Sequence, residues 1–482
     1  MPAPVQSTVA DHTDARPAEA DGLPAPRRYW SAAAIWLAMT MSVLDGAIAN
    51  VALPTIAREL RTDPASAIWI VNAYQLAITV TLLPLAALGD KLGYRRVYMV
   101  GLAVFTAGSL GCALSNSLET LTAARVLQGL GAGAIMSINS ALVRFTYPRA
   151  QLGRGIGLNA IVISVSAAIG PTVASAILAR ASWEWLFAIN LPIGLVAIAM
   201  AAFALPRTEG SRRPFDVASA VLNALTFGLL ILGAERAARD GPVAGGALLA
   251  AGAVAGVLLV RRELRRDAPL APVDLLRIPI FGLSIATSIV SFTAQMMAFV
   301  ALPFYFQGPL GRTAVQTGLL MTPWPLAVGL SAAVAGRLAD RYRAGAMGAI
   351  GLAALAAGLA ALALVSPHAS DLDIAWRMAL CGLGFGFFQT PNNKAMITSA
   401  PMDRSGAAGG MLATARLLGQ TAGAVGTAVV FHVSGTAGAP SALGIAAGLA
   451  ALAAAVSLSR LRLAPRARPL PPDEVGSEAA GP

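Results

Sequence analysis

Apolar stretches of about 20 residues recur along the whole chain, with short polar segments between them. A helix needs about 20 apolar residues to cross the ~30 Å hydrocarbon layer of a bilayer. Of the 482 residues, 56% are hydrophobic and 12% are charged, and the mean hydropathy is +0.67. This is more apolar surface than soluble cores bury. Alternating segments of about 10 residues, typical of membrane barrels, are missing from the sequence. We therefore expect an all-α polytopic membrane protein.

Apolar runs between charged loops predict fourteen transmembrane helices. The expected ranges are residues 31–54, 67–88, 97–116, 119–142, 155–179, 184–205, 216–236, 243–260, 280–306, 314–336, 345–365, 373–397, 405–432 and 440–459. The least helix-like stretch runs from Met321 to Leu326, because prolines interrupt it.

The basic residues predict the orientation of the chain. With the N-terminus in the cytoplasm, most of the 35 Lys and Arg residues fall in cytoplasmic segments. The positive-inside rule thus favours an inner (cytoplasmic) membrane protein with both termini cytoplasmic. The N-terminal tail is too long and polar for the start of a cleaved signal peptide, and the C-terminal tail is Pro-rich and charged. We expect both tails to be disordered.

Composition also argues against several functions. The net charge of +11 does not indicate nucleic-acid binding, because the basic residues form short clusters between apolar segments. Cys112 and Cys381 are too isolated for a disulfide framework or a zinc site. His12, His368 and His432 are scattered, which argues against a membrane-embedded enzyme. We expect no cofactor and no metal.

A short motif repeats in the two halves of the chain. Leu88-Gly89-Asp90-Lys91 is echoed by Leu338-Ala339-Asp340-Arg341, 250 residues later. Arg125 and the glycine run that follows it are similarly echoed by Arg377 and its glycines. Six helices need fewer residues than this offset, so it predicts two six-helix bundles with two helices inserted between them; chance similarity is the alternative. The expected parts are a cytoplasmic tail (1–28), a bundle (29–206), two linker helices (207–266), a second bundle (267–460) and a second tail (461–482).

Asp45 lies deep inside the first expected span. A carboxylate there costs at least about 2.5 kcal/mol on insertion, so we expect it to face a cavity or a partner. The low dielectric favours the protonated form, which makes Asp45 a candidate proton carrier or a docking site for a cationic substrate; a purely structural acid is the alternative. Arg125 lies at about the same depth in the fourth span, where it can pair with Asp45 or compete for its proton. Alternatively, it reaches the membrane interface.

Other polar residues within the spans are candidates for a substrate cavity. Aromatic rings and amides suit organic cations, although interfacial anchoring and helix packing are the alternatives. Arg416 lies near the middle of its span and needs a partner or water. The predicted substrate-binding residues are Asn50, Trp69, Asn72, Tyr74, Gln75, Gln389, Asn392 and Arg416.

A third group of residues is expected to act in gating. A tight cytoplasmic loop after the second span holds an acid that can cap a helix and arginines that can bind carbonyls or acids of the other half. A Gly-Pro pair in the fifth span allows close approach and bending. The predicted gating residues are Asp90, Gly93, Arg95, Arg96, Gly170 and Pro171.

Four motifs occur together in this order: Leu44-Asp45 with Asn50 to Pro54, Leu88 to Arg96, Arg125 with Gln128-Gly129, and Gly170-Pro171. Across about residues 31 to 460 the chain resembles the fourteen-helix drug:proton antiporter family of the major facilitator superfamily. The resemblance implies two six-helix bundles that work by alternating access, with Asp45 and Arg125 in proton coupling and Asp90 to Arg96 as a latch. Ala174 and Ser175 stand where that family commonly has paired glycines.

We therefore expect a proton-coupled antiporter that exports small lipophilic or cationic compounds, as in multidrug efflux. Its partners would be the small molecule, the proton and the lipid bilayer, and we expect it to work as a monomer. No P-loop pattern is present and the loops are too short for a nucleotide-binding domain, so an ion gradient is the expected energy source. The alternatives are a dedicated exporter of one metabolite or antibiotic and, remotely, a membrane-embedded enzyme.

Overall fold

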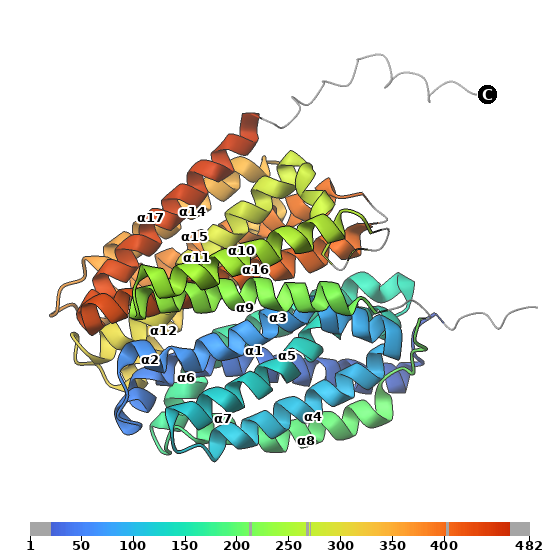
Figure 1. The fold of residues 1–482 in the computed structure, drawn as a ribbon, viewed down its shortest axis with the longest axis horizontal. Helices are drawn as coiled ribbons and strands as arrows, with labels where there is room; N and C mark the ends of the chain where they lie inside the picture. The colour runs from blue at the N-terminus through green and yellow to red at the C-terminus, as the bar shows by residue number, and fades with distance from the viewer. Residues whose placement is uncertain (1–20, 212–214, 267–268, 270, 402–403, 463–482) are drawn as a thin grey trace, which may run out of the picture.

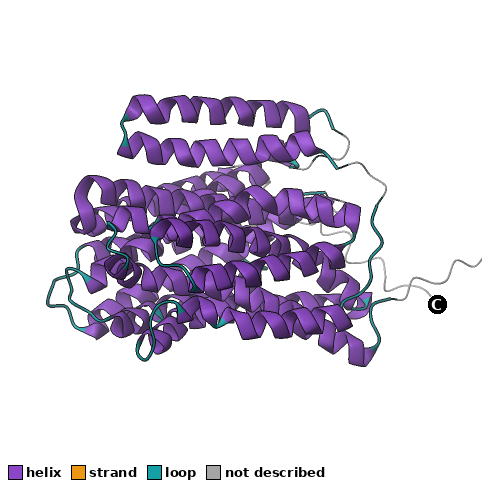
Figure 2. Ribbon diagram, turned by 60° about the horizontal axis from the view of Figure 1, so that its bottom comes forward, coloured by secondary structure: helices purple, strands orange, loops and turns teal. Residues whose placement is uncertain are grey.

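The computed structural model describes residues 21–462 except 212–214, 267–268, 270 and 402–403. All regular structure in these residues is helical, as Figure 2 shows. The predicted tails fall mainly outside the described residues, apart from 21–28 and 461–462. Residues 25–28 form the first turn of helix α1 and 461–462 end a short 3-10 helix.

The helices follow one another as two halves with a hairpin between them (Figure 1). The first half contains α1 (Ala25–Glu59), α2 (Pro64–Ala67), α3 (Trp69–Leu92), α4 (Tyr94–Ala113), α5 (Leu118–Thr146), α6 (Leu152–Leu178), α7 (Trp185–Ala188) and α8 (Asn190–Ala204). The hairpin is α9 (Val217–Arg239) and α10 (Pro242–Glu263). The second half contains α11 (Pro279–Gln307), α12 (Ala314–Met321), α13 (Pro323–Leu338), α14 (Ala344–Ala363), α15 (Asp371–Ser399), α16 (Ser405–Ser434) and α17 (Ala439–Ser459).

Twelve helical segments of the described residues are long and apolar enough to cross a membrane. One of them, Ala407–Arg462, contains α17 and all but the first two residues of α16. The 29-residue α15 is not among the twelve, although its length suffices for a span, and its first turns carry Asp371, Asp373 and Arg377. The all-α polytopic architecture is thus confirmed, whereas the number of fourteen spans stays a prediction.

Three of the expected spans are broken into two helices. Thr322 separates α12 from α13 within the proline-interrupted stretch, as its sequence predicts. The break at Ile189 is followed by Pro192, which lacks the N–H that a continuous helix would direct to the Ala188 carbonyl, whereas no proline directly follows the break at Ile68. The break at Ile189 matters for function, because it places Asn190 at the start of α8.

The same helix pairings occur in both halves. In the first half α5 packs on α3 and α4, and α1 packs on α6 and α8. In the second half α15 packs on α13 and α14, and α11 packs on α16 and α17. This equivalence agrees with the 250-residue sequence repeat, whereas the exact boundaries of the two bundles stay a prediction.

The two halves hold together at one end of the molecule. We call the end where α1 begins and α17 finishes the terminal end, and the opposite end the far end (Figure 1). Gln307 at the far end of α11 donates to the Val51 carbonyl of α1 at 3.2 Å. A second contact joins the hydroxyls of Thr172 on α6 and Thr322, 2.8 Å apart. The largest buried apolar cluster also combines far-end residues of both halves, such as Leu53 and Phe306.

At the terminal end, the apolar cores are largely separate. One cluster there is built almost wholly from the first half, including Ile35, Tyr98 and Leu142. A smaller cluster, including Phe281 and Met396, belongs to the second half. The far end is therefore the closed side of this conformation.

Gly318 in α12 allows the close approach of the halves at the far end. A Cβ atom on Gly318 would lie 1.7 Å from the Ser175 hydroxyl and 2.4 Å from the Pro171 carbonyl, both on α6 of the other half. The Gly170-Pro171 segment, which the sequence marks for gating, thus takes part in the contact that closes this end. Gly170 itself faces Ala47 of α1, because a Cβ atom there would lie 2.5 Å from that of Ala47.

We expect Gly318→Val to shift the protein toward conformations with an open far end. The valine must displace α6, and overpacking of this kind costs about 1–3 kcal/mol, which corresponds to roughly a 5- to 150-fold change in the ratio of conformers. Distances measured by double electron–electron resonance between nitroxides at Glu119→Cys, in the first turn of α5, and His368→Cys, in a far-end loop of the second half, would lengthen. Gly444→Val is the matched control because nothing lies within 4 Å of its Cβ position. Unchanged distances in Gly318→Val would contradict the prediction.

The α9–α10 hairpin lies along the outside of the bundle (Figure 2). Helix α9 packs on α3 of the first half and on α16 of the second, while α10 packs mainly on α9. Buried Asn223 of α9 donates to the Val80 carbonyl of α3 at 2.9 Å. The hairpin therefore covers the line where the two halves meet.

Asp216 ties the two helices of this hairpin together. Its carboxylate caps α9 through the Ser219 N–H at 3.2 Å and accepts hydrogen bonds from Arg262 at the end of α10 at 2.9 and 3.2 Å. These bonds, above all those from Arg262, hold the pKa of Asp216 well below its usual range. The stabilising effect is complete above the ordinary aspartate pKa of about 4 and is lost as the pH falls below it.

We expect Asp216→Ala to loosen the hairpin by about 1 kcal/mol, the typical cost of a lost helix cap, and so to raise amide exchange in the first turns of α9 about fivefold. Hydrogen exchange at neutral pH measures this effect. Asp240→Ala at the other end of α9 is the control, because its ion pair with Arg236 is exposed and contributes little. Equal exchange in both variants would show that the cap is not needed.

Candidate proton and substrate site

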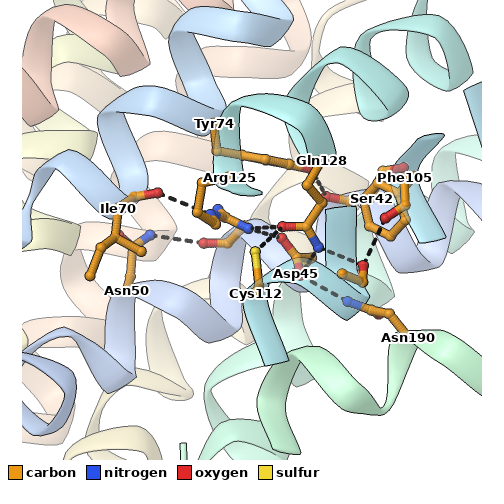
Figure 3. A network of polar contacts seen from close by, with 12 residues as sticks. Ser42, Asp45, Asn50, Ile70, Tyr74, Phe105, Cys112, Arg125, Gln128 and Asn190 are labelled. Carbon is orange, nitrogen blue, oxygen red and sulfur yellow. Dashed lines mark hydrogen bonds and ion pairs between the residues drawn. The ribbon is translucent and has the colours of Figure 1, made fainter. Parts of the chain in front are cut away.

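The acid in the first span is buried in a network of polar side chains (Figure 3). Asp45 is 2% exposed and forms an ion pair with Arg125 through its Oδ2 atom. Its Oδ1 atom accepts hydrogen bonds from the amides of Gln128 and Asn190, each at 2.9 Å. The carboxylate thus has three donors from two other helices.

Arg125 is fully buried and held on several sides. Its Nε atom donates at 2.9 Å to the carbonyl of Ile70, the second residue of α3, just after the break at Ile68. Its guanidinium carbon lies 4.0 Å from the ring centre of Tyr74 and 5.6 Å from that of Phe187, which are cation–π distances. The predicted pairing with Asp45 is present, whereas the alternative of an arginine reaching the interface is wrong.

The glycines of α5 bring this helix close to its neighbours. A Cβ atom on Gly129 would lie 2.6 Å from the Tyr74 carbonyl of α3, and one on Gly131 would lie 2.3 Å from the Phe105 nitrogen of α4. Only glycine allows helices to pack this tightly. The close packing explains how Arg125, early in α5, reaches both the α3 backbone and the carboxylate on α1.

Of the three residues that donate to the Asp45 carboxylate, Gln128 and Asn190 were not among the predicted site residues. Gln128 accepts from Arg125 at 2.6 Å and donates to the Ser109 hydroxyl at 2.8 Å, so it links the ion pair to α4. Its spacing of three residues from Arg125 places both on one face of α5, a signal that the sequence offered. Asn190 reaches Asp45 only because the chain breaks between α7 and α8, which the sequence pattern did not predict.

A cavity of about 240 Å³ lies between the halves, beside the ion pair. Ser42, Gly46 and Tyr74 form part of its wall, and the Tyr74 hydroxyl donates to the Ser42 carbonyl at 2.8 Å. Asp45 itself is not part of the wall. Tyr74 therefore touches both the cavity and Arg125, which makes it the side chain best placed to connect them.

Five of the eight predicted substrate-binding residues line this cavity: Asn50, Tyr74, Gln75, Gln389 and Arg416. At mid-depth the amide of Gln75 donates to that of Gln420 in the second half at 3.4 Å. These five residues come from four helices of both halves, as a site that is exposed alternately to the two sides requires.

The other three lie elsewhere. Trp69 donates to Glu235 of α9 at 3.1 Å, beside a separate small pocket at the far end. Asn72 is fully buried among the helices. Asn392 accepts from Arg460 at 2.7 Å and donates to the Ser288 hydroxyl at 2.8 Å, so it serves helix packing in the second half. We propose no substrate contact for these three.

The loop between α3 and α4 contacts its own half in this conformation. Asp90 accepts a hydrogen bond from Tyr94, and Arg95 donates to the Ala202 carbonyl of α8. Gly93 has a φ of +91°, and a Cβ atom there would lie 2.4 Å from the Thr208 carbonyl. Arg95 and Arg96 were expected to contact the second half. Among the described residues this contact is absent, because the two halves are apart at the terminal end. Arg96 is exposed.

The echo of Arg125 in the second half has a different environment. Arg377 binds Asp373 of its own helix at 2.9 Å and also donates to the Ala361 carbonyl. Both partners of that ion pair are partly exposed. The repeat thus reproduces the helix packing. Among the described residues, however, the arginine of this motif forms a buried ion pair in the first half and a partly exposed one in the second half.

Repeated helical halves around a central cavity that carries a few polar side chains are typical of a secondary transporter. The chain belongs to the Major Facilitator Superfamily, whose family model matches residues 35–424. It is therefore a transporter rather than an enzyme.

Relatives of this chain carry several functional names. The chain is 53% identical over 456 residues to an uncharacterized transporter, YebQ, of Escherichia coli, covering 93% of this chain and 99% of that protein. It is 32% identical to the multidrug resistance protein Stp of Mycobacterium tuberculosis (80% and 73% covered) and 30% identical to the riboflavin transporter RibZ of Clostridioides difficile (80% and 84%).

A solved structure shares the fold. It is a bacterial homologue of the human lysosomal transporter Spinster, described as inward-facing and unoccupied, with a TM-score of 0.66 at 13% identity, covering 91% of this chain and 98% of that one. At this identity the likeness shows the fold alone.

Proposed function

We propose that the protein exports small lipophilic compounds in exchange for protons, by alternating access. The observation that carries the proposal is the buried Asp45–Arg125 ion pair one layer behind the wall of the central cavity. A membrane-buried acid with a permanent cation as its partner has two states, ion-paired and protonated, that differ in local charge. Such a group can respond to a proton gradient.

Coupling would operate through the packing around the ion pair. In the ion-paired state, Asp45 connects α1 to α5 and α8, and Arg125 also binds the α3 backbone. Protonation of Asp45 would remove the charge that holds Arg125 and so weaken the connection among these helices. A substrate beside Tyr74 would bias the same packing from the cavity side. Each ligand would then favour a different arrangement of the halves, which exchange transport requires.

The available energy is sufficient for uphill export. One proton that moves down a potential of 100 mV supplies about 2.3 kcal/mol, before any contribution from a pH difference. That amount sustains about a 50-fold concentration ratio of a neutral substrate.

The cargo of this proposal is lipophilic rather than cationic. The prediction of cationic cargo depended on a carboxylate that the substrate can reach. Among the described residues, none with a carboxylate lines the central cavity, and Asp45 is committed to three donors. The names of relatives support drug efflux, whereas the riboflavin transporter favours the second candidate, a dedicated transporter of one metabolite.

For the membrane we propose the inner (cytoplasmic) membrane, with both termini cytoplasmic and a monomer as the working unit. The terminal end would then face the cytoplasm, and this conformation would be closed toward the outside. Arg262 and Arg266 at the end of α10 lie at that end, as the positive-inside rule expects.

The direct test uses purified protein in liposomes that contain a pH-sensitive dye. A pH gradient is imposed, and lipophilic compounds with acidic, neutral and basic groups are added in turn. We expect at least one compound to cause protein-dependent proton movement opposite to its own. A compound that is transported uphill with a protonophore present, or with a sodium gradient alone, would refute proton coupling while leaving the fold intact.

A further inference from the structure

Arg416 is the charged residue in the wall of the central cavity, and it has no partner in the described part of the chain. It lies near the middle of α16, mostly buried, and its Nε atom is enclosed without an acceptor. Neither a hydrogen bond nor an ion pair to another described residue is found for it. This contrasts with Arg125 and Arg460, which each have several acceptors.

The rest of the wall does not compensate for this charge. Its other strongly polar side chains are amides, which are neutral: Asn50, Gln75, Gln295, Gln389 and Gln420. Asp45, the acid buried beside the cavity, does not serve as a counterion for Arg416. It is nearly inaccessible and already accepts from Arg125, Gln128 and Asn190. The cavity therefore presents one net positive charge to whatever enters it.

A guanidinium at this depth is costly unless water or an anion balances it. An arginine also presents planar, parallel N–H groups that match a carboxylate in a bidentate arrangement. A cationic ligand would meet like-charge repulsion in the same low-dielectric space. The charge of the wall thus favours ligands with an acidic group.

The remainder of the wall is suited to an apolar, aromatic body. Phe292 and Phe385 pack edge to face with ring centres 5.2 Å apart, and Phe299 and Trp324 do so at 5.0 Å. These rings belong to the second half, as does Arg416. One wall of the cavity therefore combines a cation with aromatic surface.

We propose that the central cavity binds lipophilic organic acids, with the anionic carboxylate on Arg416 and the apolar body against the aromatic side chains of α11, α13 and α15. This proposal depends on the proposed function in one respect: the central cavity must be the substrate site. The substrate class of that site is then the lipophilic organic acids. Export of an anion from a negative interior is also favoured by the membrane potential, so such cargo adds no electrical cost.

The test is an equilibrium binding measurement with three probes that share one apolar body: 2-naphthoate, 2-naphthamide and 2-naphthylmethylammonium. The full chain is purified in detergent at pH 7.5, and affinities are measured by calorimetry without any gradient. We expect naphthoate to bind about tenfold or more tightly than the amide, the usual scale of a charged hydrogen bond, and the ammonium probe to bind weakest. Equal affinities, a preference for the ammonium probe, or no naphthoate binding at millimolar concentration would overturn the proposal.

Variants then assign the preference to Arg416. In Arg416→Gln the acid-to-amide ratio of affinities should fall to about one, while Arg416→Lys should keep part of it because the charge remains. Arg341→Gln, an exposed arginine at the terminal end, is the control and should leave the ratio unchanged. A wild-type ratio in Arg416→Gln would overturn the assignment, even if gradient-driven transport were lost, because Arg416 would then act in coupling. Failure of proton coupling with the ratio intact would refute the proposed function and leave this inference standing.

Discussion

In proteoliposomes, Asp45→Asn is expected to abolish gradient-driven accumulation while exchange of labelled for unlabelled substrate continues. Asparagine is nearly the same size and mimics the protonated acid: it loses the ion pair with Arg125 but can still accept from the amides of Gln128 and Asn190, which keep α1 connected to α5 and α8. It cannot exchange a proton. With a neutral substrate at 100 mV, the sustained concentration ratio should fall from as much as about 50-fold to about one. Exchange needs only alternating access of the loaded carrier and should keep most of its rate.

The control for this experiment is Glu119→Gln, which removes an exposed carboxylate at the far end of α5. It should behave as the wild type in both assays. If Asp45→Asn loses both exchange and accumulation while the protein stays monodisperse, Asp45 is needed for the conformational change itself. Undiminished accumulation would show that another group carries the proton.

Sequence reasoning predicted the ion pair because single charges deep in apolar spans need partners. Asp45 and Arg125 are each alone at their depth, so few pairings were possible. Gln128 and Asn190 were harder to predict, since amides are tolerated in spans and can face a cavity, a neighbouring helix or each other. The position of Asn190 depends on the break before α8, for which Pro192 in the first turn of that helix is the only local sequence signal.

The substrate cavity was predicted less completely for a related reason. Polarity shows that a side chain needs a partner, whereas it does not show whether that partner is solvent, substrate or protein. Asn392 and Arg416 looked alike in this respect in the sequence. In the structure Asn392 binds Arg460, while no acceptor for Arg416 lies among the described residues. Only the three-dimensional arrangement distinguishes a structural polar group from one available to a ligand.

The inserted hairpin is a third case. The repeat offset predicted two extra helices between the bundles, and α9 and α10 are found there. Their place over the line between the halves follows from Asn223 and Glu235, which bind α3. A hydrophobic span has no pattern that specifies which side of a bundle it covers, because lipid and protein surroundings are both apolar.

Arg125→Leu is expected to destabilise the protein severely. Removal of one partner from a buried ion pair typically costs about 3–5 kcal/mol, because the other charge stays buried without compensation. Here the change also leaves the Ile70 carbonyl without its donor and removes the cation from between Tyr74 and Phe187. Purified yield and the thermal midpoint in detergent should both fall sharply.

The double variant Asp45→Asn with Arg125→Leu separates charge from packing. If the uncompensated carboxylate causes most of the loss, neutralising it should restore much of the thermal midpoint, so the two substitutions would be strongly non-additive. Arg377→Leu is the matched control at the equivalent position of the second half, where the ion pair with Asp373 is partly exposed and should contribute at most about 1 kcal/mol. An additive double variant would instead assign the loss to the contacts of Arg125 with Ile70 and the aromatic rings. Protonation of Asp45 would then release too little energy to drive the halves apart, and the coupling proposed for this site would lose its physical basis.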